Sequence, residues 1–106
     1  LFVDDLAQAV IYALENKLSE HIYNVGSGKD ISINKLAKTI QKAVGHQGEI
    51  IWDSSKPDGT PRKLMDVSKM KAMGWTYSTE IDEGIKKTYN WFLENINNFK
   101  EIKLWK

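Results

Sequence analysis

Two short apolar segments typical of β-strands flank one strongly patterned helix between residues 21 and 52. The first, residues 21–25, ends in a Gly-Ser-Gly turn, and the second, residues 48–52, is followed by Asp53. Between them, Ser32 can cap a helix whose apolar residues recur with the helical period, and Gly45 can end it. A strand, a crossover helix and a second strand form the right-handed βαβ unit, so we expect an α/β fold with parallel pairing.

Three further helix patterns accompany this unit. Asp4 or Asp5 can cap a helix over residues 5–16, and Asp66 can cap a short helix that ends at Gly74. Residues 63–65 are expected to be extended and to pair briefly. Thr79 can open a long helix that frays into a Lys-rich tail, and its expected buried stripe consists of Ile81, Ile85, Tyr89, Phe92 and Ile96.

Length and charge limit the classes of function. A chain of 106 residues is one domain or a piece of one, and two or three strands make a poor sheet alone, so we expect residues 1–106 to pack against a larger body. The net charge of +1 provides no field suited to nucleic acid or an anionic membrane. No apolar run approaches the ~20 residues that span a bilayer. The absence of cysteine agrees with a cytoplasmic location.

Several motifs favour structural roles. Gly26-x-Gly28 lacks the third glycine of a dinucleotide fingerprint and fits a plain turn better. His21 and His46 have no second ligand at metal spacing, and we expect both to face solvent. None of the tyrosines at positions 12, 23, 77 and 89 has a lysine four residues later, so the proton-transfer pair of short-chain dehydrogenases is not found in this chain.

The segment most suggestive of a ligand site is the proline loop, residues 52–66. It contains both prolines of the chain, and its Pro-Asp-Gly turn should give it a defined shape. Guanidinium and ammonium groups can bind a pyrophosphate, and ionised carboxylates can accept hydrogen bonds from sugar hydroxyls. A surface turn with solvated charges remains an equal alternative on physical grounds alone. The candidate residues are Lys56, Arg62, Lys63, Asp53 and Asp58.

Nearly the whole chain resembles the C-terminal part of the GDP-L-fucose synthases, which are extended short-chain dehydrogenase/reductase enzymes. The matching stretches are Phe2-Val-Asp-Asp-Leu-Ala7, the segment from Tyr23 to Ile33, the proline loop, and the segments around Gly74-Trp75 and Tyr89 to Phe92. Many nucleotide-sugar enzymes share the general frame. The run Lys-Pro-Asp-Gly-Thr-Pro-Arg-Lys, residues 56–63, is much more specific to this branch.

The resemblance implies an NADP-dependent enzyme that epimerises GDP-4-keto-6-deoxy-D-mannose at C3 and C5 and reduces its C4 ketone. It implies that NADP(H) and the catalytic residues belong to an N-terminal Rossmann domain outside this chain. The chain itself would be the substrate-binding portion, inactive alone, in a homodimeric enzyme. Within it Lys63 is the expected phosphate contact, Asp53 or Asp58 the hydroxyl acceptor, and Arg62 and Lys56 second choices.

Two alternatives stay open at this point. The chain could come from an epimerase or dehydratase of the same superfamily that acts on a UDP- or dTDP-sugar. It could also be a stand-alone nucleotide-sugar-binding or packing module.

Overall fold

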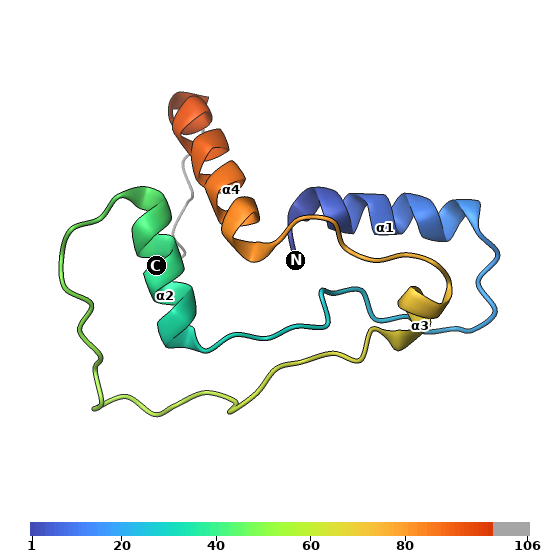
Figure 1. Ribbon diagram of the computed structural model, residues 1–106, viewed down its shortest axis with the longest axis horizontal. Coiled ribbons are helices and arrows are strands. Elements are labelled where there is room, and N and C mark those ends of the chain that lie inside the picture. Colours follow the sequence, from blue (N-terminus) through green and yellow to red (C-terminus); the bar gives the residue numbers. More distant parts are fainter. Residues whose placement is uncertain (99–106) are drawn as a thin grey trace, which may run out of the picture.

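The computed structural model describes residues 1–98, and four α-helices and one short 3₁₀ helix account for its regular structure. They are α1 (Val3–Glu15), α2 (Ile33–Val44), α3 (Ser68–Ala72), α4 (Ile81–Asn95) and η1 (Ile96–Asn98). In Figure 1, α2 and α4 lie near one another, whereas α1 and α3 lie towards the other end of the molecule. The predicted Lys-rich tail lies outside the described residues from position 99 onwards. No helix in the described part of the chain is both long and apolar enough to cross a membrane.

Helix α2 forms as its sequence predicts. The Ser32 hydroxyl accepts a hydrogen bond from the Lys35 backbone N–H at 3.2 Å, which satisfies one of the free donors at the helix start. Gly45 ends the helix with a φ of 72°, a left-handed conformation that glycine adopts without steric cost. Both ends of α2 are therefore specified by neighbouring residues.

The other helix boundaries differ from the prediction by one or a few residues. Helix α1 begins at Val3, so Asp4 and Asp5 lie inside its first turn and do not cap it. Helix α4 follows Glu80, one residue after the predicted Thr79. The Asp66 carboxylate accepts a hydrogen bond from the Ser68 backbone N–H at 2.8 Å, although the residue that directly precedes α3 is Val67.

The predicted strands are not found. Residues 21–25 and 48–52 form no strand within residues 1–98, and the structure contains no parallel pair there. A strand exists only where its backbone N–H and C=O groups pair with a neighbouring strand. Neither segment has such a neighbour among the described residues. The α/β prediction was therefore wrong for the internal structure of residues 1–98, which is helical with long connections.

Two of these connections nevertheless run side by side in opposite directions (Figure 1). The Asn24 side-chain amide donates a hydrogen bond to the Asp66 carbonyl oxygen at 3.0 Å, and six residues later Asp30 contacts Arg62. Side chains make both links, without a backbone ladder. The predicted pairing of residues 63–65 is thus replaced by an extended course alongside residues 24–30.

The Gly-Ser-Gly turn packs against this second connection. A Cβ atom at Gly26 would lie 3.4 Å from the Met65 side chain, and one at Gly28 would lie only 2.8 Å from Val67 Cγ2. Gly28 also has a φ of 69°. Close packing and a left-handed backbone explain the glycine at position 28, which supports the predicted turn.

A small apolar core joins α1 to α3. Ala9, Met70 and Trp75 are buried together, and Tyr12 packs against them. The Tyr12 hydroxyl also donates a hydrogen bond of 2.5 Å to the Met73 carbonyl oxygen, where α3 ends. Much other apolar surface is uncovered. On α1, Leu14 is 82% exposed, and from the predicted stripe Ile81, Phe92 and Ile96 are each more than 40% exposed.

Asp5 makes the main polar connection between α1 and α4. Its carboxylate is 1% exposed and accepts hydrogen bonds from the Ser78 hydroxyl at 2.6 Å and from the Thr79 backbone N–H at 2.9 Å. The Ser78 hydrogen bond is the main reason that the pKa of Asp5 lies below its ordinary value of 3.8, since burial acts in the opposite direction. Asp5 thus fixes where the chain enters α4.

Replacing Asp5 with alanine should lower the free energy of unfolding by about 2 kcal/mol, because two donors that bond a buried charge lose their acceptor. Urea unfolding followed by circular dichroism measures the change. Asp4→Ala is the matched control, since Asp4 neighbours Asp5 but is exposed. Equal losses in the two variants would contradict the role of Asp5.

The contribution of Asp5 should disappear in acid. Because its pKa is lower in the folded state, the unfolded chain binds the proton more tightly, and stability falls as the pH drops below 3.8 through the folded value. Between about pH 5 and pH 2 the urea midpoint of the Asp5→Asn variant should therefore fall less than that of the unmodified protein. Parallel curves would rule out this linkage.

Alanine at position 28 should destabilise the protein by about 1–3 kcal/mol, because a left-handed backbone is unfavourable for alanine and its Cβ would collide with Val67. Thermal unfolding tests this expectation. At Gly59 a Cβ meets no atom within 4 Å, so Gly59→Ala should change stability little. A larger loss at position 59 than at position 28 would overturn the packing argument.

Candidate functional site

An open groove of about 870 Å³ lies where the end of the proline loop meets the start of α2. One wall comes from the chain just before and at the beginning of α2, and the other comes from the loop. Four charged side chains line the groove, two from each wall. The lining residues are Lys29, Asp30, Ile31, Ser32, Ile33, Gly59, Thr60, Pro61, Arg62 and Lys63.

The first part of the proline loop is shaped by its own residues. The Asp53 carboxylate accepts hydrogen bonds from the Ser55 backbone N–H at 3.0 Å and from the Ser55 hydroxyl at 2.6 Å. These bonds, the hydroxyl bond above all, hold the pKa of Asp53 below its ordinary value. The Lys56 N–H also reaches the Asp53 carbonyl oxygen at 3.4 Å. Asp53 thus closes a local turn around Ser54 and Ser55, whereas the predicted Pro-Asp-Gly turn at residues 57–59 is not found.

Arg62 is held by a carboxylate from the opposite wall. Its Nε lies 2.5 Å from Asp30 Oδ2, and its Nη2 lies 3.4 Å from Asp30 Oδ1. The guanidinium hydrogen bond lowers the pKa of Asp30, and the same contact raises that of Arg62. Both side chains are partly solvated, at 68% and 37% exposure, so the pair contributes little to global stability. Its role is local, because it joins the two walls.

Lys29 has partners on the segment before α4. Its Nζ lies 2.9 Å from Glu80 Oε1 and 5.3 Å from the centre of the Tyr77 ring, while the Tyr77 hydroxyl donates to the same Glu80 oxygen at 2.8 Å. Tyr77 and Glu80 together raise the pKa of Lys29 well above its ordinary value. The Lys29 charge is therefore balanced within the protein.

Lys63 differs from the other two cations of the groove. Within residues 1–98 the structure gives its ammonium group no ion pair, hydrogen bond or ring contact. Lys63 is exposed and lines the groove, so its ammonium group is accessible to an anion that enters it. The role of Lys63 as a phosphate contact stays a prediction.

The remaining predicted site residues do not line this groove. Asp53, Lys56 and Asp58 are exposed and lie earlier in the proline loop. Of the five candidates, the structure therefore brings Arg62 and Lys63 to the groove and leaves three outside it.

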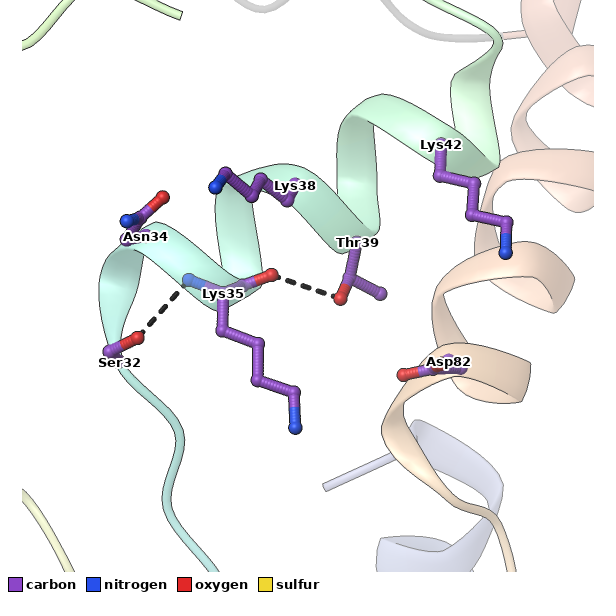
Figure 2. Close-up of a pocket in the computed structure, with 7 residues that line it drawn as sticks. All are labelled: Ser32, Asn34, Lys35, Lys38, Thr39, Lys42 and Asp82. Carbon is purple, nitrogen blue, oxygen red and sulfur yellow. Dashed lines mark hydrogen bonds between the residues drawn. The ribbon is translucent and has the colours of Figure 1, made fainter.

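A second hollow of about 500 Å³ lies between α2 and α4 (Figure 2). It is bordered by Asp82 of α4 and by three lysines of α2, Lys35, Lys38 and Lys42. Its two hydroxyl groups already serve α2, since Ser32 caps the helix and Thr39 donates to the Lys35 carbonyl oxygen at 3.0 Å. This hollow is the solvated side of a helix, so the groove at Lys63 is the better candidate.

Lys29 and Asp30 were not among the residues predicted from the sequence, although both line the groove. The available signal was their position, a charged pair between the Gly-Ser-Gly turn and the cap of α2. Ser27 fixes the backbone that leads to this pair. Its hydroxyl accepts a hydrogen bond from the Lys29 N–H at 3.2 Å and donates one to the Lys29 carbonyl oxygen at 3.1 Å.

Metal-ligating side chains do not gather in the part of the chain that the structure describes. No group of three or more histidine, aspartate or glutamate side chains is placed to hold an ion there. His21 and His46 are exposed and far apart in the sequence, as expected for solvent-facing residues.

The chain is similar in sequence to curated GDP-L-fucose synthases. It is 48% identical over 101 residues to a probable GDP-L-fucose synthase 1 of Oryza sativa and 44% identical over 110 residues to the GDP-L-fucose synthase of Escherichia coli. These alignments cover 95% and 94% of this chain, but only 31% and 34% of the relatives. The chain thus spans about a third of the length of the relatives it matches. No family model matches it.

The chain is also similar to solved structures of GDP-sugar reductases. A GDP-6-OMe-4-keto-L-xylo-heptose reductase from Campylobacter jejuni superposes with a TM-score of 0.79 at 34% identity, over 87% of this chain and 29% of that one. A GDP-mannoheptose C4 reductase from the same organism, solved with NADP bound, gives 0.73 at 35% identity, over 85% of this chain and 29% of that one.

The partial coverage of the relatives is consistent with the absence of strands within residues 1–98. Short extended segments of one third of a larger fold can have their pairing partners in the other two thirds. The resemblance found in the sequence is confirmed: over 95% of its length the chain corresponds to 31% of a GDP-L-fucose synthase.

Proposed function

We propose that this chain forms the substrate-binding part of an enzyme that converts GDP-4-keto-6-deoxy-D-mannose to GDP-L-fucose. The observation that carries the proposal is the Lys-Pro-Asp-Gly-Thr-Pro-Arg-Lys loop, residues 56–63. Its last residues line a groove and supply a cation, Lys63, that has no partner within residues 1–98. The sequence similarity to GDP-L-fucose synthases supports the identity of the substrate.

The groove's electrostatics suit a diphosphate. Arg62 and Lys29 are paired with Asp30 and Glu80, so their charges largely cancel, whereas Lys63 offers a full positive charge. The first turn of α2 begins at the same groove, and a helix start favours negative charge. In the proposed complex the Lys63 ammonium contacts a phosphate oxygen of the GDP-sugar.

Asp53 and Asp58 differ in how available their carboxylates are to accept a hydrogen bond from a substrate hydroxyl. The Asp53 carboxylate is engaged by Ser55, while Asp58 has no such bond within residues 1–98. Asp58 is therefore the better candidate for a ribose or sugar hydroxyl. Lys56, which is exposed and lies at the start of the same run, is a second choice for the pyrophosphate.

Chemistry requires residues beyond this chain. We propose that NADP(H), the epimerisation acid and base, and the reductase residues belong to a Rossmann domain that packs against the apolar surface of α1. The exposed Leu6, Val10 and Leu14 side chains support such packing, because an uncovered apolar face of this kind usually marks an interface. Residues 1–106 would then be inactive by themselves. The full-length enzyme would be a cytoplasmic homodimer.

In the full-length protein, Lys63→Ala should raise the Kd for GDP about tenfold while leaving the Kd for NADPH unchanged. The reason is the loss of one charge-assisted contact to phosphate, worth about 1.5 kcal/mol. Isothermal titration calorimetry with GDP, UDP and NADPH measures all three affinities.

Lys38→Ala is the matched control, because Lys38 is an exposed lysine that borders the other hollow. Its affinity for GDP should equal that of the unmodified protein. If Lys38→Ala weakened GDP as much as Lys63→Ala did, the groove assignment would be wrong. If UDP bound as tightly as GDP, the choice of a GDP-sugar would be wrong.

A further inference from the structure

We propose that Asp30 is a positioning residue that holds Arg62, and that this pair places Lys63 for the diphosphate. The inference rests on the proposed function and changes one of its assignments. Arg62 was a second choice for direct phosphate contact, and the geometry gives it an internal role instead. Asp30, which the sequence analysis did not select, becomes the residue on which the loop depends.

The proline loop is attached to the preceding connection at two places. At one end Asn24 binds the Asp66 carbonyl oxygen and Gly28 packs against Val67. At the other end Asp30 binds Arg62 through two nitrogen atoms. Lys63 is the first residue after Arg62 and lies between these attachments. Both must hold if the position of Lys63 is to be defined.

On the N-terminal side of Arg62, no hydrogen bond within residues 1–98 attaches the loop to another segment. In the described part of the chain, residues 53–61 make hydrogen bonds only among themselves, through the turn that Asp53 closes. The ion pair between Asp30 and Arg62 is therefore the last link before a free segment. Without it the free segment would continue through Arg62 and Lys63 as far as the attachment at Asp66.

Both partners are well placed for this role. Asp30 lies between the turn that Ser27 closes and the Ser32 cap of α2, so its backbone is restricted on both sides. Pro61 fixes its own φ directly before Arg62. Arginine bound through Nε and Nη2 to one carboxylate has a defined orientation, which lysine at this position would not provide.

Simple charge repulsion leads to the opposite expectation. Asp30 lines the groove, so its negative charge should repel a diphosphate, and its removal should then strengthen binding. If Asp30 acts through Arg62 and Lys63, its removal should weaken binding. The sign of the effect separates the two roles.

The test uses Asp30→Asn, Arg62→Ala and the charge-swapped double variant Asp30→Arg/Arg62→Asp in the full-length protein, with GDP as the probe in calorimetry. Each single variant should raise the Kd about fivefold, the scale of a partly exposed ion pair. The swapped variant restores the ion pair with reversed charges and should return the Kd to within about twofold of the unmodified protein.

Two results would overturn the inference. Tighter GDP binding by Asp30→Asn would show that Asp30 only repels the diphosphate and does not position Lys63. A swapped variant as weak as Arg62→Ala would show that Arg62 itself contacts the phosphate.

Hydrogen exchange followed by mass spectrometry supplies a second readout that needs no ligand. Asp30→Asn should speed amide exchange in residues 62–66, and the swapped variant should restore the slower rate. Failure of the unmodified protein to bind GDP would reject the proposed function, and this exchange comparison would still decide whether Asp30 holds the loop. Unchanged exchange in Asp30→Asn would overturn the positioning role.

Discussion

The buried Asp5 carboxylate is the contact that sets how α1 meets the chain entering α4. It joins the first turn of α1 to the chain that enters α4 through the Ser78 hydroxyl and the Thr79 N–H. Only three apolar side chains are buried within the described residues, so hydrophobic burial alone provides little orientation. A charged acceptor with two directional donors provides what a small core cannot, since hydrogen bonds to charged groups are stronger and more specific than apolar contacts.

Local features were predictable from the sequence. Helix α2 was predicted from Ser32 to Gly45 because capping and the apolar period act within a few residues of each other. Residues 21–25 and 48–52 have strand-like composition, but a strand needs a partner, and no local pattern says whether the partner lies in the same segment. Asp5 was misassigned for a related reason. An aspartate near a helix start resembles a cap, and its contact with Ser78 is 73 residues distant.

The candidate site follows the same division. Neighbouring residues predicted that the proline loop would be shaped by its own sequence, but the turn forms at Asp53 and Ser55 and not at the predicted Pro-Asp-Gly. The partner of Arg62 could not be predicted from neighbouring residues, because Asp30 is 32 residues away in the sequence. It also lies beside the Gly-Ser-Gly turn, to which the sequence assigned only a structural role. Composition identified the cations of the loop. It could not show which of them the protein neutralises, and that distinction decides which cation is available to a ligand.

The pairing pattern in the groove has a physical consequence for recognition. A groove lined by three unpaired cations would attract any anion, and its long side chains would lose entropy on binding each one. Here two of the cations are already fixed by Asp30 and Glu80, so the entropy of ordering them is lost on folding and not on binding. Among the described residues, Lys63 is the lining cation that has no such partner. In the proposed complex an anion would therefore be selected by its place in the groove more than by charge alone.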